Sequence, residues 1–263
     1  MRDVARVRAA CAAEWIKIRT VRSTLWTLLL SLVLSVGLGL MVGHSLSEGY
    51  SGMDRERREN FDPVAAGFLG LMVGQISLVT FGVLQIGAEY TSGTIRASLL
   101  AVPRRGLFYG AKVAVGTLTA MVFSLFTVYL TFFAAQWALG PHGMSLGDPG
   151  VPRATLGAWA YLTLMCAFSI GVATMLRSTA LTLGILIPLL FLNSQGLGNV
   201  PRIRTVAQYL PDQAGAVMMQ VVRVDEAFVS HRDFGPGTAL AIMLLWTAAA
   251  LLGGYAVLRR RDA

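Results

Sequence analysis

The sequence predicts an all-α membrane protein with six transmembrane helices, on the evidence of its composition and of six long uncharged segments. Hydrophobic residues make up 55% of the 263 residues and charged residues only 14%, and the mean hydropathy is +0.62. Soluble domains carry about 25% charged residues. An apolar segment of roughly 20 residues is long enough to cross a bilayer as a helix. The six predicted spans are 23–43, 64–88, 113–139, 154–176, 178–198 and 237–258.

Residues 1–22 precede the first span and predict a helix that lies in the membrane interface. Apolar residues recur along one side of this helix, and the basic residues fall mainly elsewhere. Such a helix keeps its apolar side in the lipid and its basic side chains near the headgroups. A disordered basic tail is the alternative, but a tail would not need an apolar stripe that includes a tryptophan. The stripe consists of Val4, Val7, Cys11, Trp15 and Ile18.

Uncharged polar residues occur within the second and fifth spans. The first interpretation is that they form hydrogen bonds between helices and hold the bundle together. The second is that some of them line a weakly polar path for a transported molecule, and Gln75 and Asn193 are the candidates. Gly70 and Gly74 form a GxxxG pattern, which predicts a close contact between two helices.

The segment 89–112 is the most informative part of the chain, because it concentrates charge between two long uncharged spans. It contains a predicted helix at 92–102. Thr91 or Ser92 is suited to cap the start of this helix, and Pro103 ends it. We expect its apolar face either to lie on lipid headgroups or to dock in another protein. That face is formed by Ile95, Leu99 and Val102.

The fourth and fifth spans are separated by Arg177 alone. A single helix through both would be about 67 Å long at 1.5 Å per residue, far more than a bilayer core of about 30 Å. Two helices joined by a tight turn at Arg177, Ser178 and Thr179 are therefore predicted. Pro188 is expected to kink or break the fifth span, since proline removes a backbone donor.

A further amphipathic helix is predicted at 210–223, outside the spans. Pro211 suits the first helical turn. We expect its apolar stripe to dip toward the membrane or to cover the outer mouth of the bundle. The stripe consists of Ala214, Val217, Met218, Val221 and Val222.

The distribution of charge orients the six spans. With an even number of spans both termini lie on one side, and that side holds 14 of the 22 basic residues but only four acidic ones. Basic residues concentrate on cytoplasmic flanks, so both termini are predicted to be cytoplasmic. The formal net charge of +8 then reflects orientation and attraction to anionic lipid. No segment is large enough to form a soluble basic domain, which argues against nucleic-acid binding.

Several function classes are disfavoured by what the spans lack. None has an ionisable residue at its centre, which argues against an ion-coupled transporter. We find no nucleophile with a partner base and no clustered ligands, so no enzyme, metal or bound cofactor is predicted in this chain. The nearest approach to a phosphate-binding loop runs from Gly106 to Lys112, with the wrong spacing and no Ser or Thr after the lysine.

Four segments carry a resemblance to a known family. They are AAEWIKIRTVRSTLWTLL near the N-terminus, EYTSGTIRASLLAVPRRGLFYGAK after the second span, LRSTA between the fourth and fifth spans, and YLPDQAG after the fifth span. Together with the spacing of the spans, they resemble the permease subunit of a type-2 ATP-binding-cassette exporter. The second segment is the most diagnostic, with an acidic residue, then G-T-x-R, a leucine pair, Pro-Arg-Arg and Gly-x-Lys.

The resemblance implies a division of labour between two kinds of subunit. A separate ATPase subunit would bind ATP and Mg²⁺, and a second permease copy or a related permease would complete the substrate path. It also implies location in the plasma membrane of a bacterium. The implied ATPase contacts are Glu89, Gly93, Thr94, Arg96, Leu99 and Leu100, and the implied external gate is Pro211, Met218 and Val221.

An alternative function is a membrane scaffold or immunity subunit that transports nothing. The two functions are distinguished by whether a co-expressed ATPase shows ATP hydrolysis that depends on this chain. The cargo stays open at this point, because peptide, lipid, antibiotic and glycan all suit an uncharged path.

Overall fold

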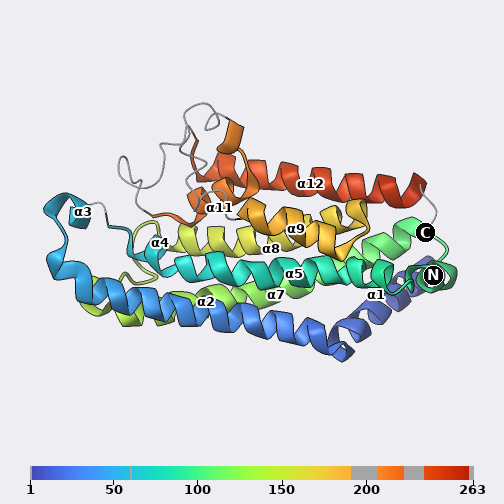
Figure 1. Cartoon of the computed structure of the whole chain (residues 1–263), viewed down its shortest axis with the longest axis horizontal. Helices are drawn as coiled ribbons and strands as arrows, with labels where there is room; N and C mark the ends of the chain where they lie inside the picture. The colour runs from blue at the N-terminus through green and yellow to red at the C-terminus, as the bar shows by residue number, and fades with distance from the viewer. Residues whose placement is uncertain (1, 60, 191–205, 222–233, 261–263) are drawn as a thin grey trace.

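A computed structural model describes residues 2–59, 61–190, 206–221 and 234–260, and within these ranges the regular elements are all helices. They run side by side in an elongated bundle (Figure 1). The helices α1 and α6 and the end of α12 lie at one end of the bundle, while α3 and α4 lie at the other. We call the first of these the α1 end and the second the α4 end.

The N-terminal part of the chain forms two helices. The helix α1, Arg2–Thr20, is followed after Val21 by α2, Arg22–Gly49. The helix α2 extends beyond the predicted span 23–43, because Ser, His and Glu residues after Gly43 do not stop a helix. It is followed by the 3₁₀ turn Tyr50–Gly52 and the short helix α3, Arg55–Glu59.

The predicted second span is divided into two helices, a short α4, Pro63–Gly67, and a long α5, Leu69–Thr91. The carboxylate of Asp62 caps α4 by accepting hydrogen bonds from the backbone N–H groups of Val64 and Ala65, at 3.0 and 2.9 Å. A carboxylate cap satisfies donors that the first turn of a helix leaves without partners.

The helix after α5 is shorter than predicted and starts later. It is α6, Ile95–Ala101, and neither Thr91 nor Ser92 caps it. The Thr91 hydroxyl instead bonds to the carbonyl of Gly87, and that of Ser92 to the carbonyl of Ala88. The predicted cap is therefore wrong, because α5 ends at Thr91 with Ser92 as its C-cap, and both hydroxyls bond to carbonyls of α5.

The next two helices are α7, Arg105–Leu139, and α8, Val151–Leu176. Proline ends α6 as predicted, but α7 begins eight residues before the predicted span at Val113, since charge alone does not interrupt a helix. The turn predicted at Arg177 is present. Arg177 adopts a left-handed φ of 54°, and α9, Thr179–Leu190, begins two residues later.

Pro188 does not end α9 within the described part of the chain, because the helix continues to Leu190. The last two helices described are α11, Pro211–Met219, and α12, Pro236–Arg260. Residues 191–198 of the predicted fifth span lie outside the described residues, as do Val222 and the end of the predicted external helix.

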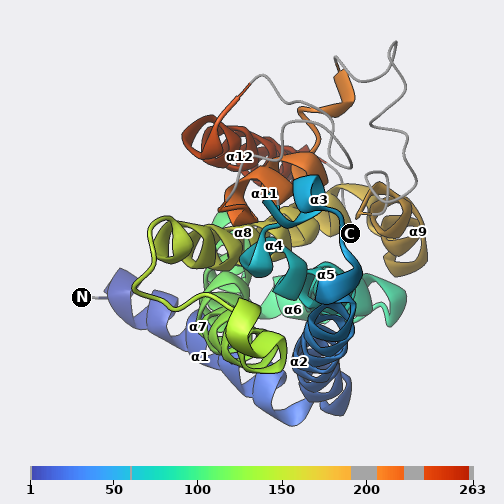
Figure 2. The same ribbon diagram turned by 90° about the vertical axis from the view of Figure 1, so that its left-hand side faces the viewer.

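Five of the described helices, α2, α5, α7, α8 and α12, are long and apolar enough to cross a membrane. This is one fewer than the six predicted, since α9 has only 12 described residues. In the most apolar windows of α5 and α8, 61% of residues are buried, against 22% in α2 and α12. The helices α5 and α8 therefore form the centre of the bundle (Figure 2). The outer helices α2, α7 and α12 carry exposed apolar side chains.

The helices α2 and α5 approach closely at the predicted GxxxG pair, which confirms that contact. A Cβ atom on Gly70 would lie 2.7 Å from the backbone nitrogen of Gly39 and would overlap the carbonyl of Ser35. One turn later the hydroxyl of Ser31 donates to the carbonyl of Gly74 at 2.9 Å. Small residues allow two backbones to approach and to exchange such hydrogen bonds.

The helix predicted at 210–223 is described over Pro211–Met219 as α11, and its stripe is buried against the bundle, but this helix has no exposed polar face. All nine residues of α11 are buried, and the helix packs against α8 and α12. Pro211 and Met218 are buried, and Val221 is half-buried. Gly157 on α8 explains the fit, because any side chain there would overlap the carbonyl of Met218.

We expect Met218→Asp to destabilise the purified protein by about 2–5 kcal/mol, because it removes a buried apolar side chain and adds a carboxylate at that site. Thermal unfolding in detergent measures the loss. Ser51→Asp, at an exposed position of the α4 end, is the matched control and should leave the unfolding temperature nearly unchanged. Equal unfolding temperatures for the two variants would contradict the buried placement of α11.

Candidate functional site

Four charged side chains from three helices meet at the α1 end of the bundle, and we call them the charge cluster. They are Glu14 and Lys17 of α1, Glu89 of α5 and Lys112 of α7. The amine of Lys112 donates to Glu14 Oε2 at 2.7 Å and to Glu89 Oε1 at 2.8 Å. The amine of Lys17 donates to Glu14 Oε1 at 2.8 Å and to Glu89 Oε1 at 2.7 Å.

Burial differs strongly within the charge cluster. The Lys112 side chain is 1% exposed, Glu14 7% and Glu89 11%, whereas Lys17 is 43% exposed. A charge out of water is tolerated only when it is paired and hydrogen-bonded. Two lysines and two glutamates give the cluster a net charge of zero, so each buried charge has an opposite neighbour.

The pKa of Lys17 reflects two opposing causes. Partial burial lowers this pKa. The hydrogen bonds from the amine to Glu14 and Glu89, together with their negative charges, raise the pKa by more than burial lowers it, so the net pKa is above the ordinary value. A raised lysine pKa contributes stability that is complete below the unfolded-state pKa. That contribution is lost only as the pH rises through the higher folded-state pKa, so Lys17 stays charged across the physiological range.

The local sequence explains how these residues come together. On α1, Glu14 lies one turn from Ala10 and one turn from Ile18, and these three residues form the side of α1 that is buried. On α7, Lys112 lies one turn after Phe108, which is also buried, and its amine is 5.3 Å from the centre of the Phe108 ring. The helix α7 reaches this site only because it starts at Arg105.

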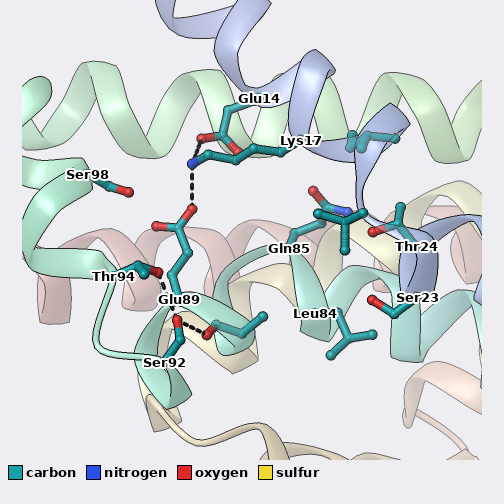
Figure 3. A pocket seen from close by; sticks show the side chains of 13 residues that line it. Glu14, Lys17, Ser23, Thr24, Leu84, Gln85, Glu89, Ser92, Thr94 and Ser98 are labelled. Carbon is teal, nitrogen blue, oxygen red and sulfur yellow. Dashed lines mark hydrogen bonds and ion pairs between the residues drawn. The ribbon is translucent and has the colours of Figure 1, made fainter.

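A pocket of about 350 Å³ opens beside the charge cluster, between the α1–α2 junction and the end of α5 (Figure 3). Figure 3 shows Lys17 directed between the carboxylates of Glu14 and Glu89. Hydroxyl groups of the α5–α6 segment line the same pocket. They belong to Ser92, Thr94 and Ser98.

The helix α6 has an inner and an outer face. Its predicted apolar face is turned inward, because Ile95 is 3% exposed and both Leu99 and Val102 pack against the core. The apolar face therefore contacts the protein's own core and does not lie on headgroups, so that docking of α6 in another protein would use its outer face. The outer face carries Arg96 and Leu100, which is 82% exposed.

The residues implied as ATPase contacts are thus divided. Gly93, Thr94, Arg96 and Leu100 are exposed, Leu99 is half-buried, and Glu89 is buried within the charge cluster. Gly93 adopts a φ of +71°, which is a conformation that glycine reaches without a steric cost. This residue allows the chain to reverse between α5 and α6.

The other candidate residues lie elsewhere. Gln75 is 3% exposed and accepts a hydrogen bond of 2.6 Å from the hydroxyl of Tyr161, which links α5 to α8. This contact is what the interpretation as a bond between helices predicts. Asn193 lies outside the described residues. At the α4 end, the backbone N–H of Val221 donates to Asp62 Oδ2 at 2.7 Å and ties the end of α11 to the start of α4.

The sequence did not predict that these four residues meet. Glu14 was counted only among the four acidic residues of the predicted cytoplasmic side, and Lys17 was expected near the headgroups. Lys112 was noted as the lysine of the Gly-x-Lys motif, without a partner. The available signal was that Glu14 lies between Cys11 and Ile18 on an apolar side of its helix, and that Lys112 directly precedes a long apolar run. A charge on an apolar face requires an opposite charge nearby.

The long apolar helices and the polar segment at one end define a multi-pass membrane protein. A comparison with models of protein families gives a match over residues 10–193, more than half of the chain, to the family described as ABC-2 family transporter protein. The chain belongs to this family, whose members are the membrane component of their transporters. No curated protein matches the chain.

Proposed function

We propose that this chain is the permease subunit of an ATP-driven exporter and that a separate ATP-binding-cassette ATPase docks at its α1 end. Membership of the ABC-2 transporter family supports the permease role. The observation that carries the docking site is the outer face of α6, where Arg96 and Leu100 are exposed. Here α6 lies at the α1 end of a membrane bundle, beyond the central part of the spans.

The chemistry of this face suits a protein partner. Leu100 is an apolar side chain that is 82% exposed. Arg96 is exposed one turn before it, so a partner with an apolar pocket and a nearby carboxylate would contact both. Arginine is among the residue types that most often dominate the affinity of an interface.

We expect Leu100→Glu and Arg96→Glu each to weaken the complex with the ATPase at least about tenfold. Each change removes a contact worth about 1–2 kcal/mol and adds a negative charge to the contact surface. Neither change alters a span, so the variants should insert normally. Co-purification with a co-expressed ATPase measures binding. The control is Gly110→Ala, because a Cβ atom there meets nothing within 4 Å. Wild-type binding by both glutamate variants would rule out this face.

We propose that the α1 end faces the cytoplasm, and the concentration of basic residues on that side supports this orientation. In a background with Cys11→Ser and Cys166→Ala, we expect Ser51→Cys and Gly147→Cys to react with an impermeant maleimide on intact cells. Ala97→Cys, on the exposed side of α6, should react only after the cells are opened. Labelling of Ala97→Cys from outside would reverse the proposed orientation.

The working unit is proposed to hold two permease chains, either two copies or this chain and a related one, around a shared path. Membrane lipid surrounds the apolar outer surfaces of α2, α7 and α12. The same ATPase experiment separates this proposal from a scaffold or immunity subunit. ATP hydrolysis that depends on this chain and drives loss of a substrate from the cell supports a transporter, and hydrolysis that is indifferent to it supports the alternative.

A further inference from the structure

The helix α1 is held to the bundle mainly by charges. Among the side chains of α1 that the structure describes, Ala10 and Ile18 are the buried apolar ones and Cys11 packs against the core while half-buried, whereas Val4, Val7 and Trp15 are exposed. Hollows of about 440 and 300 Å³ lie between α1 and the end of α6, beside the start of α7. Because few side chains fill the space between α1 and α6, apolar packing does not fix the position of α1 relative to α6.

The hydrogen bonds of the charge cluster fix the position of α1 against α5 and α7. A lysine amine has three hydrogen-bond donors. All three donors of Lys112 are used, by Glu14 Oε2 at 2.7 Å, by Glu89 Oε1 at 2.8 Å and by the carbonyl of Gln85 at 2.8 Å. Lys17 connects the same two glutamates from the exposed side. These hydrogen bonds form a network that joins α1, α5 and α7.

The charge cluster lies next to two short connections of the chain, one from α5 to α6 and one from α1 to α2. Glu89 lies in the last turn of α5, and Ser92, Gly93 and Thr94 follow before α6 begins. On the other side, α1 leads into α2 through the single residue Val21, whose backbone N–H donates to the carbonyl of Lys17 at 3.0 Å. A displacement of the α5–α6 junction therefore reaches Glu89 first, then α1, and then the start of the α2 span.

We propose that Glu14, Lys17, Glu89 and Lys112 are positioning residues that make α1 move as one body with the α5–α6 junction, so that movement of α6 is transmitted to α2. This rests on the proposed function, in which α6 is the element that the ATPase contacts. The four residues touch neither ATP nor substrate. Their role is to keep the distance between α1 and α6 constant while the rest of the permease changes shape.

The first test uses the permease without an ATPase. Spin labels are placed at Ala12 and Ala97, which are exposed on α1 and α6, in the background with Cys11→Ser and Cys166→Ala. We expect a narrow distribution of distances in the otherwise unchanged chain. The double variant Glu14→Gln with Lys112→Gln removes one charge of each sign and leaves the Lys17–Glu89 pair intact. In this variant we expect the distribution to broaden.

A matched control removes an ion pair elsewhere. Arg55 and Glu59 form an exposed pair at 2.8 Å at the α4 end. Replacing both with Gln should leave the Ala12–Ala97 distribution narrow, because an exposed pair contributes little. A distribution that stays equally narrow when Glu14 and Lys112 are replaced would overturn the proposal.

The second test uses the complex with the ATPase. We expect the Glu14→Gln, Lys112→Gln variant to bind the ATPase and to support hydrolysis, while transport per ATP hydrolysed falls by about tenfold, within the usual range of coupling free energies. A role limited to stability would lower binding, hydrolysis and transport together. Unchanged transport per ATP in the double variant overturns the proposal. If the unchanged chain shows no ATP-dependent transport, the proposed function fails, whereas the distance measurement still decides the link.

Discussion

Lys112→Met is expected to destabilise the protein by about 3–5 kcal/mol, the cost of breaking a buried ion pair by removing one partner. The reason is that Lys112 is 1% exposed and bonds to two carboxylates that are themselves almost fully buried. Without it, Glu14 and Glu89 share a single half-exposed lysine, and the buried site carries a net negative charge. Loss of helical structure during denaturant titration in detergent measures the change.

Lys17→Met is the matched control for this prediction. Lys17 contacts the same two glutamates, but its side chain is 43% exposed, so water replaces the lost contacts. We expect a loss of about 1 kcal/mol or less for this variant, in line with exposed pairs. Losses of equal size for Lys112→Met and Lys17→Met would show that burial does not decide the strength of the charge cluster.

Gly70→Ala is expected to separate α2 from α5 and to destabilise the protein by about 1–3 kcal/mol, the usual cost of overpacking. The added Cβ atom would overlap the carbonyl of Ser35 and would lie 2.7 Å from the backbone nitrogen of Gly39. Both neighbours are backbone atoms of α2, so neither turns aside as a long side chain would. Relief requires movement of a whole helix.

The control for this prediction is Gly37→Ala, on α2 itself. A Cβ atom at Gly37 meets nothing within 4 Å, and alanine favours a helix by up to about 1 kcal/mol over glycine. The two Gly-to-Ala changes should therefore have opposite signs, which thermal unfolding of the purified variants detects. A stabilising Gly70→Ala would mean that α2 and α5 do not approach as the structure shows.

The sequence by itself determined the class of protein and the main breaks between helices. Long runs without charge indicate membrane spans because ionic groups are costly in hydrocarbon, and this requires no knowledge of neighbours. Pro103 and Arg177 mark helix ends for reasons that are also local, a missing backbone donor in one case and the length limit of a span in the other. The close contact at Gly70 and Gly74 was indicated by a pattern of small residues.

Helix boundaries were less accurate where the sequence offered no local stop. The third span was predicted to start at Val113, after the last charge of the polar segment, yet α7 begins at Arg105 and includes Lys112, because arginine and lysine are good helix formers. Similarly, Thr91 and Ser92 are capping residues by type, but α5 continues through Thr91 and both hydroxyls bond to carbonyls one turn earlier. Residue type alone does not decide between these two uses of a hydroxyl.

Only the tertiary structure decided which faces are buried and which charges meet. The apolar face of α6 was recognised from its spacing, but its direction, toward the protein's own core, depends on helices that are distant in sequence. The same holds for α11, whose buried position is set by α8 and α12. Glu14 and Lys112 are 98 residues apart along the chain. Their pairing has no local signature, because an ion pair depends on distance in space and on exclusion of water, and both are properties of the packed bundle.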